Sequence, residues 1–193
     1  MTLEVQVVRV FCDEHGAHGN ELGLVVGDDL TLGREQEIAA RLGFSETVVL
    51  DVAPTDPERV ARLRIFTPAV ELPFAGHPTV GAAWWLASRG TPAVALDVPA
   101  GRVDVRHEGG IALVTARPEW APDFTVRELG SGSEVDALDP DEFASGQHYL
   151  WAWLGEGEIR ARMFAPAFGI REDEATGAAA VAVTGSLGRG LTI

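Results

Sequence analysis

The sequence predicts an α+β protein built from two equivalent halves, each containing strands that lead into a helix without charged residues. An internal repeat carries this prediction. The segments 62–69 and 160–167 lie 98 residues apart and read Arg-Leu-Arg-Ile-Phe-Thr-Pro-Ala and Arg-Ala-Arg-Met-Phe-Ala-Pro-Ala. Each segment is followed by a polar loop and then by an uncharged helix. Self-similarity at half the chain length indicates two halves related by a pseudo-two-fold axis.

The first half is expected to contain four strands and two helices. Its apolar and β-branched runs predict strands over 5–11, 22–26, 47–52 and 61–66. A polar loop joins the first two strands, and a turn is expected over 54–57. Thr31 is the expected N-cap of the first helix, and Gly43 stands just past its end. The second helix, over 79–89, is apolar on every face, which is typical of a buried helix.

The second half is expected to follow a connection over 91–99. Its predicted strands cover 101–106, 111–116, 149–154 and 158–164, and its uncharged helix covers 176–187. The acidic, turn-rich stretch 119–141 gives no clear pattern. We therefore place an N-terminal half-domain at 1–95 and a shortened C-terminal half-domain at 96–193.

Composition excludes several classes of function. The formal net charge of −14 would repel a phosphate backbone or an anionic membrane surface, so we expect no nucleic-acid or membrane partner. The longest uncharged stretch, 72–88, contains prolines and glycines and is too short to span a bilayer. The single cysteine, Cys12, and the lack of a secretory pattern at the start favour a cytoplasmic protein.

Both uncharged helices begin in loops suited to anion binding. The first loop covers 74–79 and the second covers 172–177. The first N–H groups of a helix lack intrahelical acceptors, and the helix dipole makes that end positive. Gly76 and Gly177 would let a substrate carboxylate approach the backbone closely. No nucleotide-binding glycine pattern and no complete set of metal ligands occurs, so we expect neither a cofactor nor a metal.

Three polar residues, one on a separate strand and two in these loops, have two interpretations each. Glu46 stands at the mouth of an apolar strand, where partial desolvation would suit a general acid or base, but the residues alone favour an ordinary solvated glutamate at a strand end. His77 could act in catalysis or simply cap and pack its helix. Asp173 could contact the substrate or only place a negative charge at a helix N-terminus.

Four segments together resemble the PhzF-like family of phenazine biosynthesis, which shares the diaminopimelate-epimerase fold. They are Val10-Phe-Cys-Asp with Gly19-Asn20, Ser45-Glu-Thr-Val, Phe74-Ala-Gly-His-Pro-Thr, and Arg162-Met-Phe-Ala-Pro followed by Glu172-Asp-Glu-Ala-Thr-Gly. The resemblance implies two pseudo-symmetric halves, each a mixed, curved sheet wrapped around a central buried helix. It also places the chain apart from relatives that use two cysteines.

The resemblance also implies roles for individual residues. Glu46 would be the general acid/base, with His77 and Asp173 as its polar partners in the cleft. Residues in the same motifs would bind the substrate: Asn20, Gly76, Thr79, Thr176, Gly177 and Ala178. The chain departs from the family pattern where Ala178 replaces a serine and Glu174 replaces a proline.

The expected function is that of a cofactor-independent isomerase or epimerase. It would move a proton on a small carboxylate, an amino or hydroxy acid that is cyclic in the best-known relative, bound between the two halves. The alternative is a non-catalytic relative that binds a small molecule in the same cleft. A homodimer is expected from the resemblance and from sheet edges that a shortened second half would expose.

Overall fold

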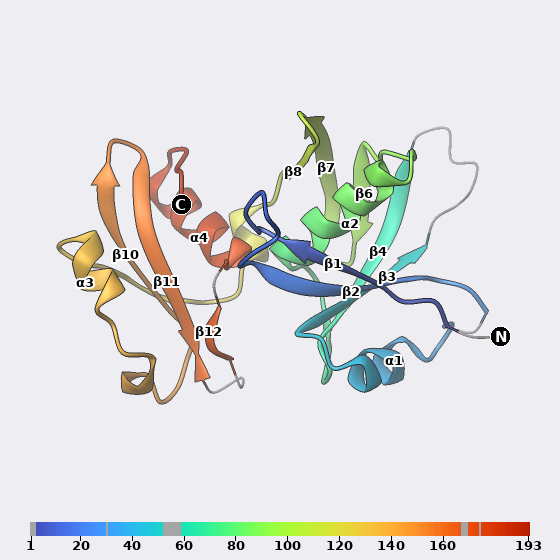
Figure 1. Cartoon of the computed structure of the whole chain (residues 1–193), viewed down its shortest axis with the longest axis horizontal. Helices are drawn as coiled ribbons and strands as arrows, with labels where there is room; N and C mark the ends of the chain where they lie inside the picture. The colour runs from blue at the N-terminus through green and yellow to red at the C-terminus, as the bar shows by residue number, and fades with distance from the viewer. Residues whose placement is uncertain (1–2, 30, 52–58, 167–169, 174) are drawn as a thin grey trace. The chain divides into compact units, whose positions relative to one another are not determined.

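The computed structural model describes residues 3–29, 31–51, 59–166, 170–173 and 175–193. The chain divides into two compact units, Met1–Ala116 and Arg117–Ile193. Each unit contains a mixed β-sheet and few helices, which confirms the expected α+β class (Figure 1). This division falls later in the chain than the boundary at 95/96 expected from the sequence. The turn expected over 54–57 and Ala167 of the repeat lie outside the described residues.

The described residues of the first unit form a sheet of eight strands. They are β1 (Gln6–Val10), β2 (Asn20–Val26), β3 (Glu46–Asp51), β4 (Val60–Phe66), β5 (Glu71–Leu72), β6 (Ala95–Val98), β7 (Gly101–Glu108) and β8 (Ile111–Val114). Their order is β1-β2-β3-β4-β6-β7-β8, and β5 pairs with β4. The pairs β2–β3 and β4–β6 are parallel. Parallel neighbours need a crossover, and the helices α1 (Glu35–Leu42) and α2 (Gly76–Ser88) supply the two crossovers.

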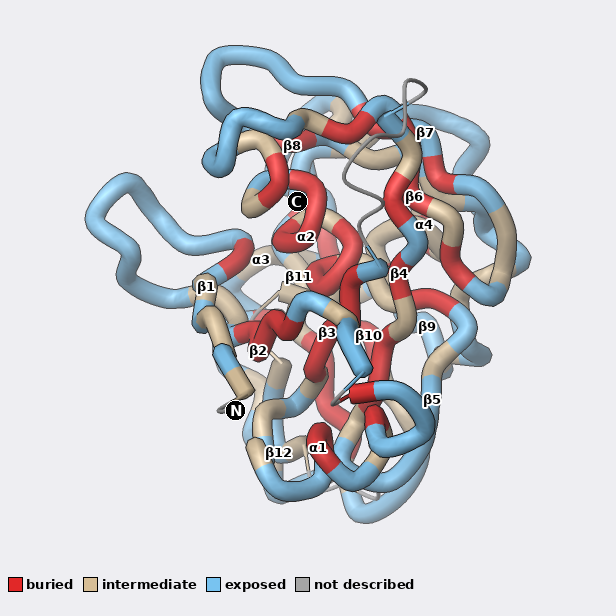
Figure 2. Tube along the Cα trace, turned by 90° about the vertical axis from the view of Figure 1, so that its right-hand side faces the viewer, coloured by how far each residue is buried: buried red, intermediate tan, exposed pale blue. Residues whose placement is uncertain are grey.

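Helix α2 is the core element of the first unit. It packs against β1, β2, β3 and β8, so the sheet curls until both of its end strands reach the same helix. Residues of α2 and of the central strands appear as buried segments in Figure 2. Seven of its thirteen residues are buried: His77, Pro78, Thr79, Gly81, Ala82, Ala83 and Leu86. Burial of an uncharged helix on most sides agrees with its composition.

Three local predictions for the first unit are wrong. Helix α2 begins at Gly76 and not at Thr79, because Pro78 is tolerated in a first turn, where its missing N–H is not needed. The segment expected to connect the halves contains β6, which pairs with β4 and β7. Thr31 does not cap α1, which has Arg34 at its N-cap; the Thr31 hydroxyl instead donates to the carbonyl of Asp28 at 2.9 Å and closes a turn.

The described residues of the second unit form a sheet of four strands, in the order β12-β11-β10-β9. The strands are β9 (Thr125–Glu128), β10 (His148–Gly155), β11 (Glu158–Ala165) and β12 (Ile170–Asp173). Two α-helices, α3 (Gly132–Asp136) and α4 (Gly177–Leu187), and two short 3₁₀ helices, η1 (Pro118–Trp120) and η2 (Pro140–Glu142), complete it. No helix in the described part of the chain is long and apolar enough to cross a membrane.

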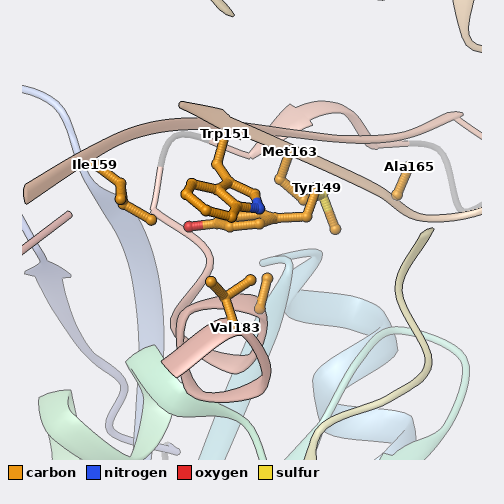
Figure 3. Packing of buried hydrophobic residues seen from close by; sticks show 7 residues of the cluster. Tyr149, Trp151, Ile159, Met163, Ala165 and Val183 are labelled. Atoms are coloured by element: carbon orange, nitrogen blue, oxygen red, sulfur yellow. The ribbon is translucent and has the colours of Figure 1, made fainter. Parts of the chain in front are cut away.

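Helix α4 lies on one side of this sheet. Its buried residues are Ala179 and Val183, which join a cluster with Tyr149, Trp151 and Met163 of the sheet. Figure 3 shows the rings of Tyr149 and Trp151 above the side chain of Val183. Only two of the eleven residues of α4 are buried, although the helix contains no charged residue.

The repeated arginine has the same structural role in both units. In the first unit, the guanidinium of Arg64 on β4 makes two hydrogen bonds, of 2.7 and 2.8 Å, to the carboxylate of Glu71 on β5. It also lies 3.0 Å from Glu35 of α1 and over the ring of Phe66. This bidentate pair holds the chain that leads into α2 against the sheet.

In the second unit, Arg162 on β11 binds Glu172 on β12 through two hydrogen bonds of 2.7 Å. It lies over the ring of Phe164, and its remaining nitrogen donates to carbonyl groups at the end of α3, which belong to Val135, Asp136 and Leu138. The hydrogen bonds from Arg162 hold the pKa of Glu172 below its ordinary value, although partial burial opposes the shift. The Arg162–Glu172 ion pair thus fixes the position of Glu172, the residue immediately before Asp173.

The close approach of α2 to the sheet depends on Gly81. A Cβ atom at this position would lie 2.6 Å from Cδ2 of Leu22 and 2.7 Å from Cγ2 of Val10, and both of those side chains are buried. We predict that Gly81→Val lowers the free energy of unfolding by about 1–3 kcal/mol, the usual cost of overpacking. Chemical denaturation measures this change. Gly155→Ala is the control, since nothing lies within 4 Å of its Cβ position; equal stability of Gly81→Val and the parent would contradict the packing.

The Arg162–Glu172 pair predicts a pH-dependent contribution to stability. A carboxyl group whose pKa is lowered by folding stabilises the protein above its unfolded-state pKa, near 4.5, and this contribution disappears as the pH falls through the lower folded value. At pH 7, Glu172→Gln should lose about 1–2 kcal/mol, because the pair is bidentate but partly exposed. Denaturation at several pH values should show the difference from the parent shrinking below pH 4.5. A difference that is constant from pH 7 to 3, or as large for the exposed control Glu158→Gln, would refute the assignment.

Candidate active site

Glu46 is the first residue of β3, and it lies beside Leu22 of the parallel strand β2. The four residues that follow it on β3 are buried. The side chain of Glu46 is 18% exposed, so its carboxylate stands at the border between the core and solvent. The alternative considered from the sequence, a fully solvated glutamate, therefore does not describe Glu46.

His77 is the second residue of α2, and its side chain is 8% exposed. The Nε2 atom of His77 lies 3.5 Å from Oε2 of Glu46. The packing of α2 inside the curled sheet brings these two residues together, although they are 31 positions apart in the sequence. The structure therefore joins one carboxylate and one imidazole at the N-terminus of a buried helix.

Three further residues of the first unit were expected to bind the substrate. Asn20 begins β2, and β2 and β3 are parallel, so Asn20 and Glu46 lie at the same edge of the sheet. Gly76 is the first residue of α2 and is half-buried. Thr79 is fully buried, and its hydroxyl donates to the carbonyl of Ala75 at 2.7 Å, which closes the first turn of the helix.

In the second unit, Asp173 organises the start of α4. One of its carboxylate oxygens accepts a hydrogen bond from the Thr176 hydroxyl at 2.8 Å, and the other accepts one from the N–H of Ala175 at 3.3 Å. Thr176 is the N-cap residue of α4, and Gly177 and Ala178 are its first two helical residues. The structure therefore places four of the expected residues together at one helix N-terminus. Ala178 is the second residue of its helix, as His77 is of α2.

Tyr149 is a member of this second group that the sequence did not indicate. Across the sheet, Tyr149 on β10 lies opposite Met163, and Met163 lies opposite Asp173 on β12. Burial raises the pKa of the Tyr149 phenol to about 12, and the negative charge of Asp173 adds to the shift. The phenol is therefore a neutral hydrogen-bonding group at neutral pH. Only the strand register, which the sequence does not specify, brings it near Asp173.

Arg64 and Arg162 were also overlooked as contributors to the site. Both belong to the repeat, and their identity at the two positions was the available signal. Their ion pairs with Glu71 and Glu172 anchor the segments that precede the two helix N-termini. Among the described residues, no group of three or more His, Cys, Asp or Glu side chains is placed to hold a metal ion.

The arrangement in the first unit suits proton transfer. A carboxylate at the edge of the core can accept or donate a proton, and a neighbouring imidazole can stabilise either charge state. The backbone N–H groups at the start of α2 point toward the N-terminal end of the helix, where they favour a negatively charged ligand.

Comparison with known proteins identifies the family. The model of the phenazine biosynthesis-like proteins, PhzC-PhzF, matches residues 8–138. The trans-2,3-dihydro-3-hydroxyanthranilate isomerase of Pseudomonas aeruginosa is 31% identical over 192 residues, which cover 79% of this chain and 68% of the relative. An uncharacterized isomerase of Pasteurella multocida is 46% identical over 81 residues, or 42% of this chain and 27% of that protein.

Solved structures show the same fold at low sequence identity. A phenazine biosynthesis PhzC/PhzF protein from Clostridium difficile matches 97% of this chain and 84% of its own, with a TM-score of 0.72 and 19% identity. A protein of Pseudomonas aeruginosa described as a predicted epimerase matches 96% of this chain and 81% of its own, with a TM-score of 0.57 and 21% identity. These findings confirm the resemblance found in the sequence. The chain belongs to the PhzC-PhzF family of phenazine biosynthesis-like proteins and is an isomerase.

Proposed function

We propose that this isomerase moves a proton on a small carboxylate, an amino or hydroxy acid, with Glu46 as the general acid/base. The observation that carries the proposal is the contact between Glu46 and His77, whose side-chain nitrogen and oxygen lie 3.5 Å apart with both side chains largely buried. A relative that is 31% identical is named for an isomerisation of a dihydro-hydroxyanthranilate, which is a substrate of this chemical class.

The proposed reaction uses side chains and backbone dipoles. The Glu46 carboxylate takes a proton from a carbon atom of the substrate, and the electron pair of that C–H bond moves into the conjugated system. The same carboxyl group then returns the proton at another atom, so the reaction is balanced without a redox step and needs no cofactor. His77 stabilises the charge of Glu46 at each stage, and the N–H groups at the start of α2 favour the substrate carboxylate.

The roles of the residues at the N-terminus of α4 are part of the same proposal. Asp173, Thr176, Gly177 and Ala178 would contact polar groups of the substrate, as the resemblance implies. Their support is local: a carboxylate and a helix N-terminus lie together in the second unit, as they do in the first. The methyl group of Ala178 cannot donate a hydrogen bond, which favours a substrate with fewer polar groups at that point.

The test is exchange of carbon-bound hydrogen with deuterated solvent, followed by mass spectrometry. Trans-2,3-dihydro-3-hydroxyanthranilate is the first probe, and small amino and hydroxy acids are the further probes. Glu46→Gln keeps the shape and removes the titrating group, so it should lower the exchange rate ~10²–10⁴-fold while leaving the unfolding temperature nearly unchanged.

Asp51→Asn, at the exposed far end of the same strand, is the matched control and should exchange at the parental rate. Exchange by Glu46→Gln as fast as by the parent would show that Glu46 has no role in proton transfer. Failure of the parent to exchange any probe would count against proton transfer on small carboxylates altogether.

A further inference from the structure

The pairing of the strands shows which residues of the two units correspond. In the first unit, Thr47 of β3 lies opposite Phe66 of β4, and in the second unit, His148 of β10 lies opposite Phe164 of β11. Phe66 and Phe164 occupy the same position of the sequence repeat. His148 therefore corresponds to Thr47, and strand β10 corresponds to strand β3.

Gln147 is consequently the counterpart of Glu46. Each directly precedes the residue that lies opposite the repeated phenylalanine. The parallel neighbour of each strand agrees, since β3 pairs with β2 and β10 pairs with β9. The N–H of Thr125 on β9 donates to the carbonyl of Gln147 at 2.8 Å, so Gln147 continues the hydrogen-bond ladder of β10. The second unit thus has an amide side chain where the first has a carboxylate.

The side chain of Gln147 belongs to the face of the sheet that packs on α4. Side chains alternate between the two faces of a strand, so Gln147 shares a face with Tyr149 and Trp151. These two side chains join one buried cluster with Val183 of α4, and Figure 3 shows both rings above it. In the first unit, the face of β3 that carries Glu46 packs on α2 in the same way.

The two helices also begin at corresponding places. Helix α2 begins five residues after Glu71, and α4 begins five residues after Glu172. These are the two glutamates that the repeated arginines bind. The second helical residue is His77 in α2 and Ala178 in α4. The second unit therefore keeps the arrangement of the first, but an amide replaces the carboxylate and a methyl group replaces the imidazole.

The amide of Gln147 is available to a ligand. Gln147 is one of three glutamines in the chain, and the other two, Gln6 and Gln36, donate hydrogen bonds to Glu4 and to the carbonyl of Thr67. The side chain of Gln147 is half-buried, and no residue that the structure describes forms a hydrogen bond with it. A half-buried amide without a protein partner is satisfied by water or by a bound molecule.

We propose that Gln147 is a specificity-determining residue that contacts the substrate beside the N-terminus of α4. Its amide donates a hydrogen bond to a hydroxyl or carbonyl oxygen of the substrate. The inference rests on the proposed function, in which residues at the start of α4 contact the substrate. An amide does not titrate near neutral pH, so Gln147 selects and holds the substrate, whereas its counterpart Glu46 moves the proton.

A direct contact can be observed by nuclear magnetic resonance. The chain has only four side-chain amides, those of Gln6, Asn20, Gln36 and Gln147, so their ¹⁵N-bound hydrogens give few signals. The spectrum of Gln147→Ala identifies the pair that belongs to Gln147. Saturation with trans-2,3-dihydro-3-hydroxyanthranilate, or with the small amino and hydroxy acids, should shift this pair. The Gln6 pair, at the start of β1, is the internal control and should not shift.

Kinetics separate a substrate contact from a structural role. Gln147→Ala should raise KM for hydrogen exchange about tenfold and change kcat by less than about threefold, because one hydrogen bond made throughout the reaction is lost. Gln147→Glu should also raise KM at pH 7, where the new carboxylate cannot donate. Its KM should return toward the parental value as the pH falls from 7 to about 4.5, because protonation of the carboxyl group restores a donor.

Gln6→Glu adds the same charge at the start of β1 and should have the parental KM at each pH. The inference is overturned if no probe shifts the Gln147 amide, if both Gln147 variants keep the parental KM, or if the raised KM of Gln147→Glu does not depend on pH. If the parent exchanges a probe while the Gln147 amide is unaffected, the inference fails and the proposed function stands. A probe that shifts the Gln147 amide but does not exchange supports the contact and contradicts the proposed reaction.

Discussion

The structure depends on the enclosure of helices that carry no charged residue. In the first unit, a mixed sheet curls around α2 until its two end strands reach the helix. This packing buries the N-terminal turn of α2 and thereby sets His77 against Glu46 at the start of β3. The contact between helix and sheet is close because Gly81 leaves room for Leu22 and Val10. In the second unit, Ala179 and Val183 are the buried residues of α4, and they pack against side chains of the sheet.

The repeated arginines explain how two different sequences reach equivalent arrangements. Each arginine binds a glutamate on the strand before the helix and lies over a phenylalanine two residues further along its own strand. The third contact differs: Arg64 meets a carboxylate of α1, and Arg162 meets carbonyl groups at the end of α3. A planar guanidinium can satisfy both environments, since it offers five donors in fixed directions. The direction of each chain entering its helix N-terminus follows from these contacts.

Much of the fold could be predicted from the sequence because its signals were strong and local. The repeat of Arg-x-Arg-x-Phe located β4 and β11, and the uncharged runs located α2 and α4. Strand β6 was missed because four residues between prolines carry little periodicity, and its identity depends on pairing with the distant strand β4. Strand β9 and helix α3 were missed because their stretch is acidic and mostly exposed.

The sequence predicted less of the candidate site than of the fold. No spacing rule connects Glu46 with His77, and only the family resemblance suggested them as partners. Tyr149 became visible only through the register of β10, β11 and β12. Such contacts depend on which strands pair and in which register. The residue pattern of a single strand does not specify either.

The central claim is that Glu46 and His77 act as one unit in proton transfer. A double-mutant cycle of hydrogen-exchange rates tests it, with Glu46→Gln, His77→Asn and the double variant compared under identical conditions. Residues that work as a unit lose most of their effect with the first substitution, so the double variant should be little slower than Glu46→Gln alone. If the two rate losses instead multiply as independent factors, the contact between the two side chains has no part in the chemistry.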